Sequence, residues 1–445
     1  MRHVLAFLAM AVALVLSMTS ITAGELAQRF RADAARLLER SKSDKALMPV
    51  LEDFCDHYPR RLSGSENLER SLDWLVAKFK SDGWNVYTQP VMVPNWKRNE
   101  ASLTMSLPMS RSLPVAALGG SEATNGSLKA KVIVVKSYDE LRQRKAEVAG
   151  RIVVYNVDFT TYGATVKYRF GGASEAARYG AVATLVRSVG PFGLQTLHTG
   201  GMGYNDSLAK IPTAAITMED AMLLQRMQDR GEVVELDLTM NCKWEKDAPS
   251  RNVVLELKGT EKPNEVVVMG GHIDSWDLGA GAMDDAGGCF VAWRALAHMR
   301  DLGMRPKRTI RVVFWTNEEN GIRGGKAYAE QTKNDTHVLA IESDMGTFAP
   351  QGFSTNAKGV TRSQIEDIAS LLMPVHASQI EDGEGGADIS PLEERGVPVM
   401  GLKVDDTKYF WYHHTEADTP DKLDAREMND CVYAMAVMSW CFANM

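Results

Sequence analysis

Several motifs that the sequence lacks narrow its function. Its 445 residues include only five cysteines, and no two of them have the Cys-x-x-Cys spacing of a cysteine zinc site. No more than two basic residues stand side by side, and the net charge is −7, which argues against nucleic acid as a partner. The sequence has no Gly-x-Ser-x-Gly elbow, P-loop or paired-glycine dinucleotide motif. It therefore indicates neither a serine nucleophile nor a bound nucleotide.

Long apolar runs are also absent, except at the N-terminus. Residues 4–18 are almost wholly apolar, follow a basic residue and precede a run of small residues. That order is typical of a secretory signal peptide, residues 1–23, and the run is short for a membrane-spanning helix; an uncleaved anchor is the alternative. We expect an exported mature chain without a membrane span, secreted or otherwise extracytoplasmic (lysosomal or periplasmic, depending on the source). Export permits a disulfide, and Cys55 with Cys242 is a conceivable pair.

The length of the chain suggests two domains, one inserted in the other. Composition changes near Leu113, and from there to about residue 245 the apolar runs are short, β-branched and separated by Gly, Ser and Thr. We expect residues 113–245 to form an α/β or mainly β module without catalytic residues of its own. Residues 24–112 and 246–445 would then form the catalytic domain.

The flanking segments alternate between helical and strand patterns. Residues 25–57 have helical periodicity, Ser65 is placed to cap a helix that ends near Ser81, and residues 85–93 alternate like a strand. After residue 251 we expect strands at Val253–Leu257, Glu265–Gly270, Thr309–Trp315, Val338–Ser343 and Val397–Leu402, and helices at Ala286–Met299, Gly324–Lys333, Arg362–Leu372 and Asp424–Phe442. This order predicts an α/β fold with a mixed, mostly parallel sheet flanked by helices. Active sites of such sheets lie at the carboxyl ends of the strands.

Histidines and carboxylates follow these strands. The loop 270–288 alone holds one histidine, four aspartates and six glycines, and by itself it fits a solvated acidic turn. The groups that follow successive strands, or precede the last helix, are His272 with Asp274, Asp284 and Asp285; Glu318 with Glu319; Glu342 with Asp344; and His413 with His414. Imidazole and carboxylate without thiolate suit zinc, and manganese or cobalt less well.

These carboxylates are too many for a single zinc with three protein ligands. Two ions about 3.5–4 Å apart, bridged by one carboxylate and one water, would use them all. In that arrangement His272 and Asp344 hold one ion, Glu319 and His414 hold the other, and Asp284 bridges both. Each ion then keeps a position open for water, as catalysis requires.

Two further carboxylates have roles beside the ions. Asp274, two residues after His272, is placed to fix the orientation of that imidazole. Glu318 is adjacent to a ligand but not used as one, so we expect it to act as the general base that takes a proton from the bridging water.

The order of five motifs resembles a known family. Gly-Gly-His-x-Asp, Gly-Ala-x-Asp-Asp-x-x-Gly, Asn-Glu-Glu-x-Gly, Glu-Ser-Asp-x-Gly and His-Thr-x-x-Asp are similar to those of the co-catalytic zinc exopeptidases of the aminopeptidase and carboxypeptidase type, clan MH. The pieces that resemble one branch specifically are Arg60–Ser65, Gly271–Asp277, Gly281–Asp285 and Tyr412–Thr415; Gly180–Val186 and Ile211–Ile216 resemble the protease-associated domain inserted in these enzymes.

The resemblance implies two zinc ions on the five ligands named above, with Glu318 as the base. It also implies a homodimer that cleaves dipeptides and short peptides with free termini, and a cis peptide after Asp284. The family motif places the ligand directly before threonine, which selects His414 over His413.

Other features allow more than one interpretation. Gly386, Asp388, Tyr412 and His413 are candidates for the substrate pocket. The loop with Gly386 and Asp388 fits a simple turn equally well, the aromatic cluster with Tyr412 is more often core, and the alternatives for His413 are support of the metal ligands or exposure to solvent. The rivals to a peptidase are a single-zinc acyltransferase of the glutaminyl-cyclase type and a receptor-like ectodomain without metal. Trp276 and Asp277 we expect to shape their loop rather than bind substrate.

Overall fold

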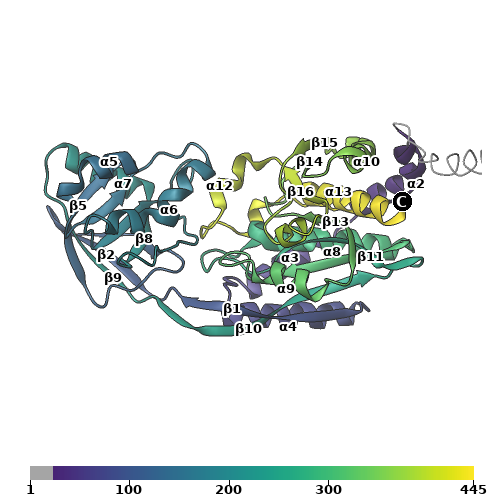
Figure 1. Cartoon of the computed structure of the whole chain (residues 1–445), viewed down its shortest axis with the longest axis horizontal. Coiled ribbons are helices and arrows are strands. Elements are labelled where there is room, and N and C mark those ends of the chain that lie inside the picture. The colour runs from purple at the N-terminus through teal and green to yellow at the C-terminus, as the bar shows by residue number, and fades with distance from the viewer. Residues whose placement is uncertain (1–23) are drawn as a thin grey trace, which may run out of the picture.

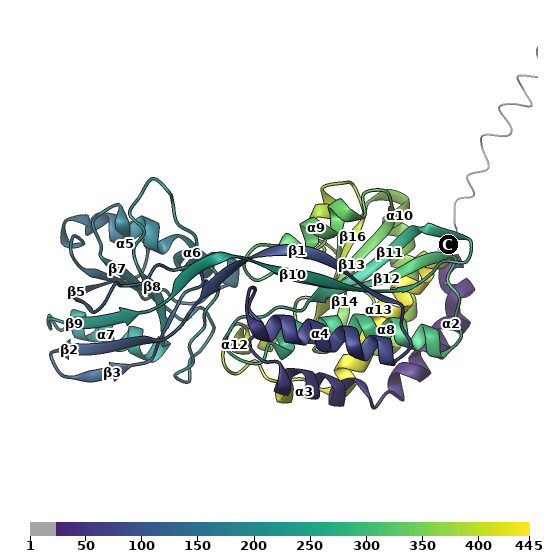
Figure 2. The ribbon, with the colours of Figure 1, turned by 90° about the horizontal axis from the view of Figure 1, so that it is seen from below.

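The computed structural model describes residues 24–445, so the expected signal peptide at 1–23 lies outside the described residues. Two halves, each built on a sheet, lie side by side along the long axis of the molecule (Figure 1). The strands β1 (Val86–Lys97) and β10 (Lys243–Leu257) pair antiparallel and run from one half into the other (Figure 2). Within residues 24–445 we find no helix with the length and apolar character needed to cross a membrane.

In the described part of the chain, three helices precede the first strand: α2 (Glu25–Lys42), α3 (Leu47–His57) and α4 (Glu66–Ser81). The expected helical stretch 25–57 is therefore two helices, because Asp44 in the break turns inward and is buried. Ser65 caps α4 as expected, since its Oγ accepts a hydrogen bond from the backbone N–H of Leu68 at 3.1 Å.

The catalytic half contains an eight-stranded mixed sheet in the order β1-β10-β12-β11-β13-β16-β14-β15. Its central strands β12 (Arg308–Trp315), β11 (Lys262–His272), β13 (Thr336–Glu342) and β16 (Val399–Val404) are mutually parallel. The five expected strands are confirmed with shifted ends. Two strands at the edge, β14 (Pro350–Thr355) and β15 (Gln379–Asp382), were not expected, because the first contains proline and glycine and the second is short and mostly exposed.

Helices cover both faces of this sheet. Alternate residues of β11 pack on opposite sides: Val267 and Met269 contact one cluster, and Val266 and Val268 contact the other. The first side carries the N-terminal helices, α8 (Gly287–Asp301), α10 (Gly359–Ala369) and α13 (Ala425–Asn444), and the second carries α9 (Arg323–Gln331) and α11 (Ser390–Glu393). The four expected helices are confirmed, and the sheet is buried as its apolar strands require.

The other half, which we call the second sheet unit, contains eight strands between Ala101 and Met240 in the order β3-β2-β9-β5-β6-β7-β8-β4. The strands are β2 (Ala101–Leu107), β3 (Arg111–Leu113), β4 (Val115–Ala117), β5 (Leu128–Val135), β6 (Ile152–Tyr155), β7 (Ala183–Arg187), β8 (Thr213–Ile216) and β9 (Glu235–Met240), and the helices are α5 (Tyr138–Gln143), α6 (Tyr162–Ala177) and α7 (Met218–Asp229). Strands β5 to β8 are parallel. The sheet starts before residue 113, so the expected segment 113–245 leaves out β2.

The conceivable pair of Cys55 and Cys242 is not formed. All five cysteines are free and buried. Cys55 packs in the core of the catalytic half and Cys242 in the core of the second sheet unit, so two separate cores keep them apart.

A buried ion pair joins α8 to the break between α2 and α3. Asp44 Oδ2 accepts a hydrogen bond from Arg294 Nε at 2.7 Å and lies 3.0 Å from His298 Nε2. Burial opposes ionisation of Asp44, but the hydrogen bonds from His298 and from the Ala46 backbone, with the Arg294 charge, outweigh it and lower the pKa of this carboxyl. The ionised form of Asp44 therefore stabilises the fold.

We expect Asp44→Asn to lower the free energy of unfolding by about 3–5 kcal/mol at pH 7, because it leaves the Arg294 charge buried and uncompensated. The control is Asp301→Asn, which breaks the more exposed pair with Arg40 (2.8 Å) and should cost no more than about 1 kcal/mol. Urea unfolding of both variants makes the comparison.

The stabilisation of the fold by ionised Asp44 depends on pH. The folded pKa of Asp44 lies below its ordinary value of 3.8, so the stabilisation is complete above that pH and is lost progressively below it. The stability difference between wild type and Asp44→Asn should shrink as the pH falls below about 3.8. Equal unfolding free energies for the Asp44 and Asp301 variants at pH 7 would contradict the assignment.

Candidate metal centre

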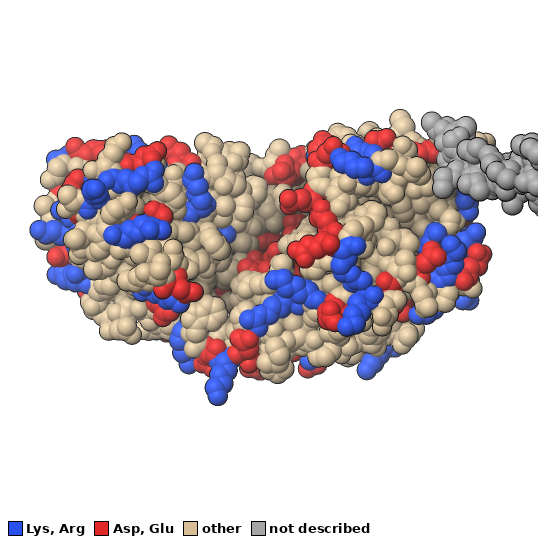
Figure 3. Space-filling model, in the orientation of Figure 1, with Lys and Arg blue, Asp and Glu red and all other residues tan. Residues whose placement is uncertain are grey.

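Acidic side chains gather in the hollow between the two halves (Figure 3). A cavity of about 330 Å³ opens there, at the carboxyl ends of the central strands. Its lining residues come from both halves: Tyr162, Arg169, Phe170 and Gly201 from the second sheet unit, and Asp284, Glu318, Glu319, Asp344, Met345, Tyr409, Phe410, His413 and His414 from the catalytic half. The convergence expected from the strand order is therefore present.

One group of ligand atoms surrounds His272, the last residue of β11. Its Nε2 lies 3.1 Å from Asp284 Oδ1 and 3.1 Å from Asp344 Oδ1. Asp344 follows β13, and Asp284 lies in the loop that leads from β11 to α8. These three residues can hold one metal ion.

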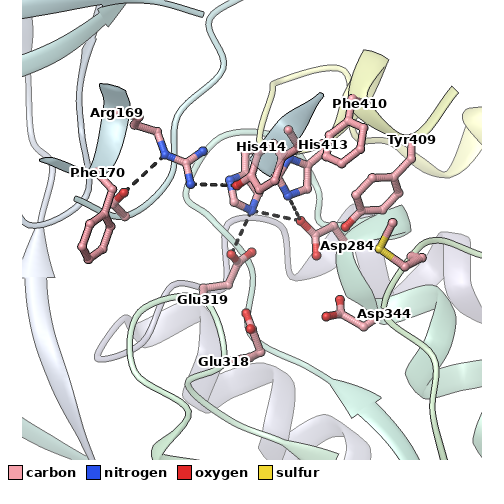
Figure 4. Close-up of a pocket in the computed structure, with 13 residues that line it drawn as sticks. Arg169, Phe170, Asp284, Glu318, Glu319, Asp344, Tyr409, Phe410, His413 and His414 are labelled. Atoms are coloured by element: carbon pink, nitrogen blue, oxygen red, sulfur yellow. Dashed lines mark hydrogen bonds and ion pairs between the residues drawn. The ribbon is translucent and has the colours of Figure 1, made fainter. Parts of the chain in front are cut away.

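A second group surrounds His414, and it shares Asp284 with the first. His414 Nε2 lies 3.2 Å from Asp284 Oδ2 and 3.1 Å from Glu319 Oε2 (Figure 4). The two oxygens of Asp284 therefore face two different imidazoles, one on each side. This is the arrangement of a carboxylate that bridges two ions.

The electrostatics of the cluster fit two divalent cations. Asp284 Oδ2 is fully buried and accepts no hydrogen bond within the described part of the chain. Burial and the neighbouring Asp284 charge raise the pKa of Glu319 to about 7, and burial with the Asp284 charge also raises that of Asp344. Carboxylates this close repel each other unless a cation lies between them. Three carboxylates and two imidazoles, without thiolate, are a donor set that suits zinc.

His413 is the competing imidazole. Its Nε2 lies 3.5 Å from Asp284 Oδ2, and its ring stacks on that of His414. His413 Nδ1 lies 3.0 Å from His198 Nε2 of the second sheet unit. Among residues 24–445 only His414 of the two also pairs with Glu319, which favours the choice of His414 as the ligand.

Asp274 fixes the site in a different way from the one expected. The Nδ1 of His272 is 3.0 Å from the backbone oxygen of Asp274, whereas the Asp274 carboxylate is 3.9 Å away. That carboxylate instead accepts the backbone N–H of Glu318 at 3.1 Å. Asp274 thus positions both the imidazole and the residue expected to act as base.

Glu318 points into the cavity beside Glu319 and opposite Asp344 (Figure 4). Its carboxylate takes no hydrogen bond from residues 24–445. Burial raises the pKa of Glu318, and the charges of Asp344 and Glu319 add to that effect. A carboxylate that holds no structural hydrogen bond is free to exchange a proton with a ligand in the cavity.

Two aspartates hold the loop that carries Asp284. Asp285 accepts the backbone N–H groups of His272 and Gly288, each at 3.1 Å, which gives a role to a residue that the sequence left unexplained. Asp418 accepts three backbone N–H groups between residues 282 and 284. The peptide bond after Asp284 is cis, as the resemblance implied.

The glycines of this loop allow close packing. A Cβ on Gly271 would lie 2.1 Å from Asp285 Oδ2, and one on Gly288 would lie 2.2 Å from the backbone oxygen of Ser343. Any side chain at either position would push the loop away from its strand.

The expected substrate-pocket residues are dispersed. His413 lines the cavity, and Tyr412 lines a neighbouring hollow of about 280 Å³. Asp388 is buried, and its backbone N–H donates to Glu342 Oε1 at 3.3 Å. Gly386 packs directly against the Glu342 side chain.

Trp276 and Asp277 connect the metal-site loop to the second sheet unit. Trp276 packs in the core of that unit, with its ring tip so close to Gly119 that a Cβ there would lie 2.0 Å away. Asp277 forms a partly buried ion pair with Arg98. Both residues shape the loop, as expected.

Sequence reasoning missed the contribution of the second sheet unit. We expected no catalytic residues there, yet Arg169 lines the cavity and His198 contacts His413. Neither residue belongs to a motif with a recognisable spacing, so the sequence carried no signal for either.

Comparison with known proteins identifies the family. Residues 252–439 match the model of peptidase family M28. Carboxypeptidase Q of Xenopus laevis is 44% identical over 88% of this chain and 84% of its own length, and a solved peptidase M28 precursor from Shewanella amazonensis SB2B has a TM-score of 0.90 at 33% identity, covering 94% of this chain and 97% of its own. A zinc aminopeptidase from Bacillus subtilis shares the fold at 18% identity, with a TM-score of 0.67 over 88% of this chain and 93% of its own. We conclude that the chain belongs to peptidase family M28 and is a hydrolase homologous to carboxypeptidase Q.

Proposed function

We propose that the protein is a two-zinc exopeptidase that hydrolyses dipeptides and short peptides with free termini. The observation that carries this proposal is the shared carboxylate: Asp284 Oδ1 is 3.1 Å from His272 Nε2, and Asp284 Oδ2 is 3.2 Å from His414 Nε2. Asp344 completes the first ion's ligands and Glu319 the second's. Three protein ligands on each ion leave room for water and substrate.

The residues of the cavity then divide the work of hydrolysis. Two zinc ions held by these five ligands would lower the pKa of a bound water and polarise the peptide carbonyl. Glu318 takes the proton from the attacking water and delivers it to the leaving amine. The Asp274 carboxylate accepts the backbone N–H of Glu318, and the Asp274 backbone oxygen contacts the imidazole of His272. These two contacts fix the position of the base relative to one metal ligand.

The size of the cavity supports a small substrate. A volume of about 330 Å³ is at the lower end for ligand pockets, which favours a dipeptide over a folded protein. Tyr162 and Phe410 stack at its wall with ring centroids 4.8 Å apart. Such a wall can hold a side chain of the substrate by apolar contact.

A panel of small substrates tests this function. We expect a free dipeptide to be hydrolysed, the same dipeptide with a blocked N-terminus to be cleaved much more slowly, and 1,10-phenanthroline to abolish turnover until zinc is restored. Hydrolysis that survives complete removal of zinc would contradict the proposal. Full activity with a single bound zinc would instead favour the acyltransferase-type site.

From the same resemblance we propose that the mature chain is exported and works as a homodimer. We also propose that the second sheet unit, expected at 113–245 and extended back to Ala101 by β2 and β3, is a protease-associated domain inserted into a catalytic domain made of the flanking segments. Its parallel strands β5 to β8 and their helices support a separate folding unit.

A further inference from the structure

We propose that an irregular segment of the second sheet unit, residues 198–201, is part of the metal centre. This segment orients His414 toward the ions, and Arg169 is the positioning residue that fixes the segment. The inference rests on the two-zinc function proposed above and extends it to a part of the chain outside the catalytic half.

Thr199 contacts His414 both at its backbone oxygen and at its imidazole ring. The backbone N–H of Thr199 donates to the backbone oxygen of His414 at 3.0 Å, and its hydroxyl donates to the same oxygen at 3.3 Å. The backbone oxygen of Thr199 lies 3.3 Å from His414 Nδ1. With the Nδ1 proton directed to this carbonyl, the lone pair of Nε2 faces Asp284 and Glu319, as a metal ligand requires.

The backbone of His414 needs this support. Its φ is 57°, in the left-handed region that residues other than glycine adopt uncommonly. Such a conformation persists where surrounding contacts determine it. The contacts from Thr199 act on this residue, and His198 adds a contact to its neighbour, with Nε2 3.0 Å from His413 Nδ1.

Arg169 fixes the position of the segment 198–201. Its guanidinium donates to the backbone oxygen of Thr199 from Nη1 at 2.8 Å, and to that of Gly201 from Nε at 3.3 Å. A Cβ on Gly200 would lie 2.5 Å from Arg169 Cζ, so the guanidinium packs directly on the backbone of the segment 198–201. Arg169 is only 5% exposed and forms no ion pair with an acidic residue in the part of the chain that the structure describes. Its donors bond to the segment 198–201 and to the Tyr162 hydroxyl (2.8 Å).

The two histidine ligands therefore differ in what orients them. His272 directs its Nδ1 to the backbone of Asp274 in its own loop, two residues away. His414 depends on Thr199, 215 positions earlier in the chain and in the other half of the molecule. A less fixed segment 198–201 should lower the affinity for the ion held by His414 and Glu319. The affinity for the ion held by His272 and Asp344 should stay unchanged.

The test measures zinc affinity in Arg169→Met, which keeps a long side chain but removes every donor. We expect one of the two zinc ions to bind about 10–100-fold more weakly, as with loss of other residues that orient a ligand, and the other to keep its wild-type affinity. Excess zinc should restore much of kcat, and Arg169→Lys should give an intermediate affinity. Competition with a chromophoric chelator reads both affinities, and the visible spectrum of the cobalt-substituted protein reports the geometry of the weakened site.

The matched control is Arg144→Met. Arg144 is another arginine of the second sheet unit that donates to a backbone oxygen, that of Val134 at 3.0 Å, but it follows α5 at the end of the unit away from the catalytic half (Figure 1). It should leave both zinc affinities unchanged. If Arg169→Met does not fold, Arg169→Lys and Thr199→Val carry the test, because each removes only part of the network.

Two results would overturn the inference. One is wild-type affinity for both zinc ions in Arg169→Met. The other is unchanged zinc binding with a raised KM for a free dipeptide but not for its C-terminal amide, which would make Arg169 a binder of the substrate carboxylate. A wild-type protein that binds fewer than two zinc ions would refute the proposed function itself, so the two failures are distinguishable.

Discussion

Asp284→Asn is expected to lower kcat/KM by about a thousandfold or more. The two carboxylate oxygens of Asp284 face His272 on one side and His414 on the other. A neutral amide at this position should therefore weaken the binding of both zinc ions. Metal ions contribute several kcal/mol to the stabilisation of a hydrolytic transition state, and each 1.36 kcal/mol is a factor of ten in rate. Steady-state hydrolysis of a free dipeptide at buffered zinc measures the loss.

The control for this variant is Asp421→Asn, which makes the same substitution at an exposed aspartate near the site, paired with Lys422. It should retain activity close to that of the wild type. Wild-type kcat/KM in Asp284→Asn would show that this carboxylate does not bridge ions needed for hydrolysis.

Glu318→Gln is expected to lower kcat by about 10²–10⁴-fold while both zinc ions remain bound. The reason is that Glu318 contacts neither histidine ligand and takes no hydrogen bond from the described residues, so its carboxylate is available only for proton transfer. KM should change much less than kcat, because the substitution keeps the shape of the cavity wall. Parallel measurement of turnover and of zinc per chain separates a lost base from a lost ligand.

Glu416→Gln serves as the control, since Glu416 is an exposed glutamate two residues after His414. Turnover of Glu318→Gln at the wild-type rate would remove Glu318 from the mechanism. Loss of zinc in Glu318→Gln would mean that it is a ligand, and the base would have to be sought elsewhere.

The sequence predicted those parts of the catalytic half in which a residue pattern has a single structural explanation. Buried parallel strands contain near-continuous apolar runs, so β11, β12 and β13 were recognisable. A carboxylate or histidine at or shortly after the end of each strand had to lie at the same sheet edge. Strands β14 and β15 escaped because neither has such a run. The break between α2 and α3 also escaped, because a single buried aspartate, Asp44, interrupts an otherwise continuous helical pattern.

The sequence predicted which side chains gather at the candidate site, but not the contacts that orient them. His272, Asp284, Glu319, Asp344 and His414 are all brought together, since each chemical type has a specific use at a metal. The contacts that orient them are mainly made by backbone atoms, such as the carbonyls of residues 199 and 274, and a backbone atom leaves no mark on residue type. The separation of 215 positions between Thr199 and His414 likewise carries no periodicity from which proximity could be inferred.

In the proposed site one carboxylate, Asp284, joins two zinc ions. Mass spectrometry that counts zinc per chain after equilibration at buffered free zinc tests this role. This bridging role predicts two zinc ions per chain in the wild type, both needed for full activity, and fewer than two in Asp284→Asn under the same conditions. One zinc ion per chain in fully active wild-type protein, or two retained with wild-type affinity in Asp284→Asn, would contradict it.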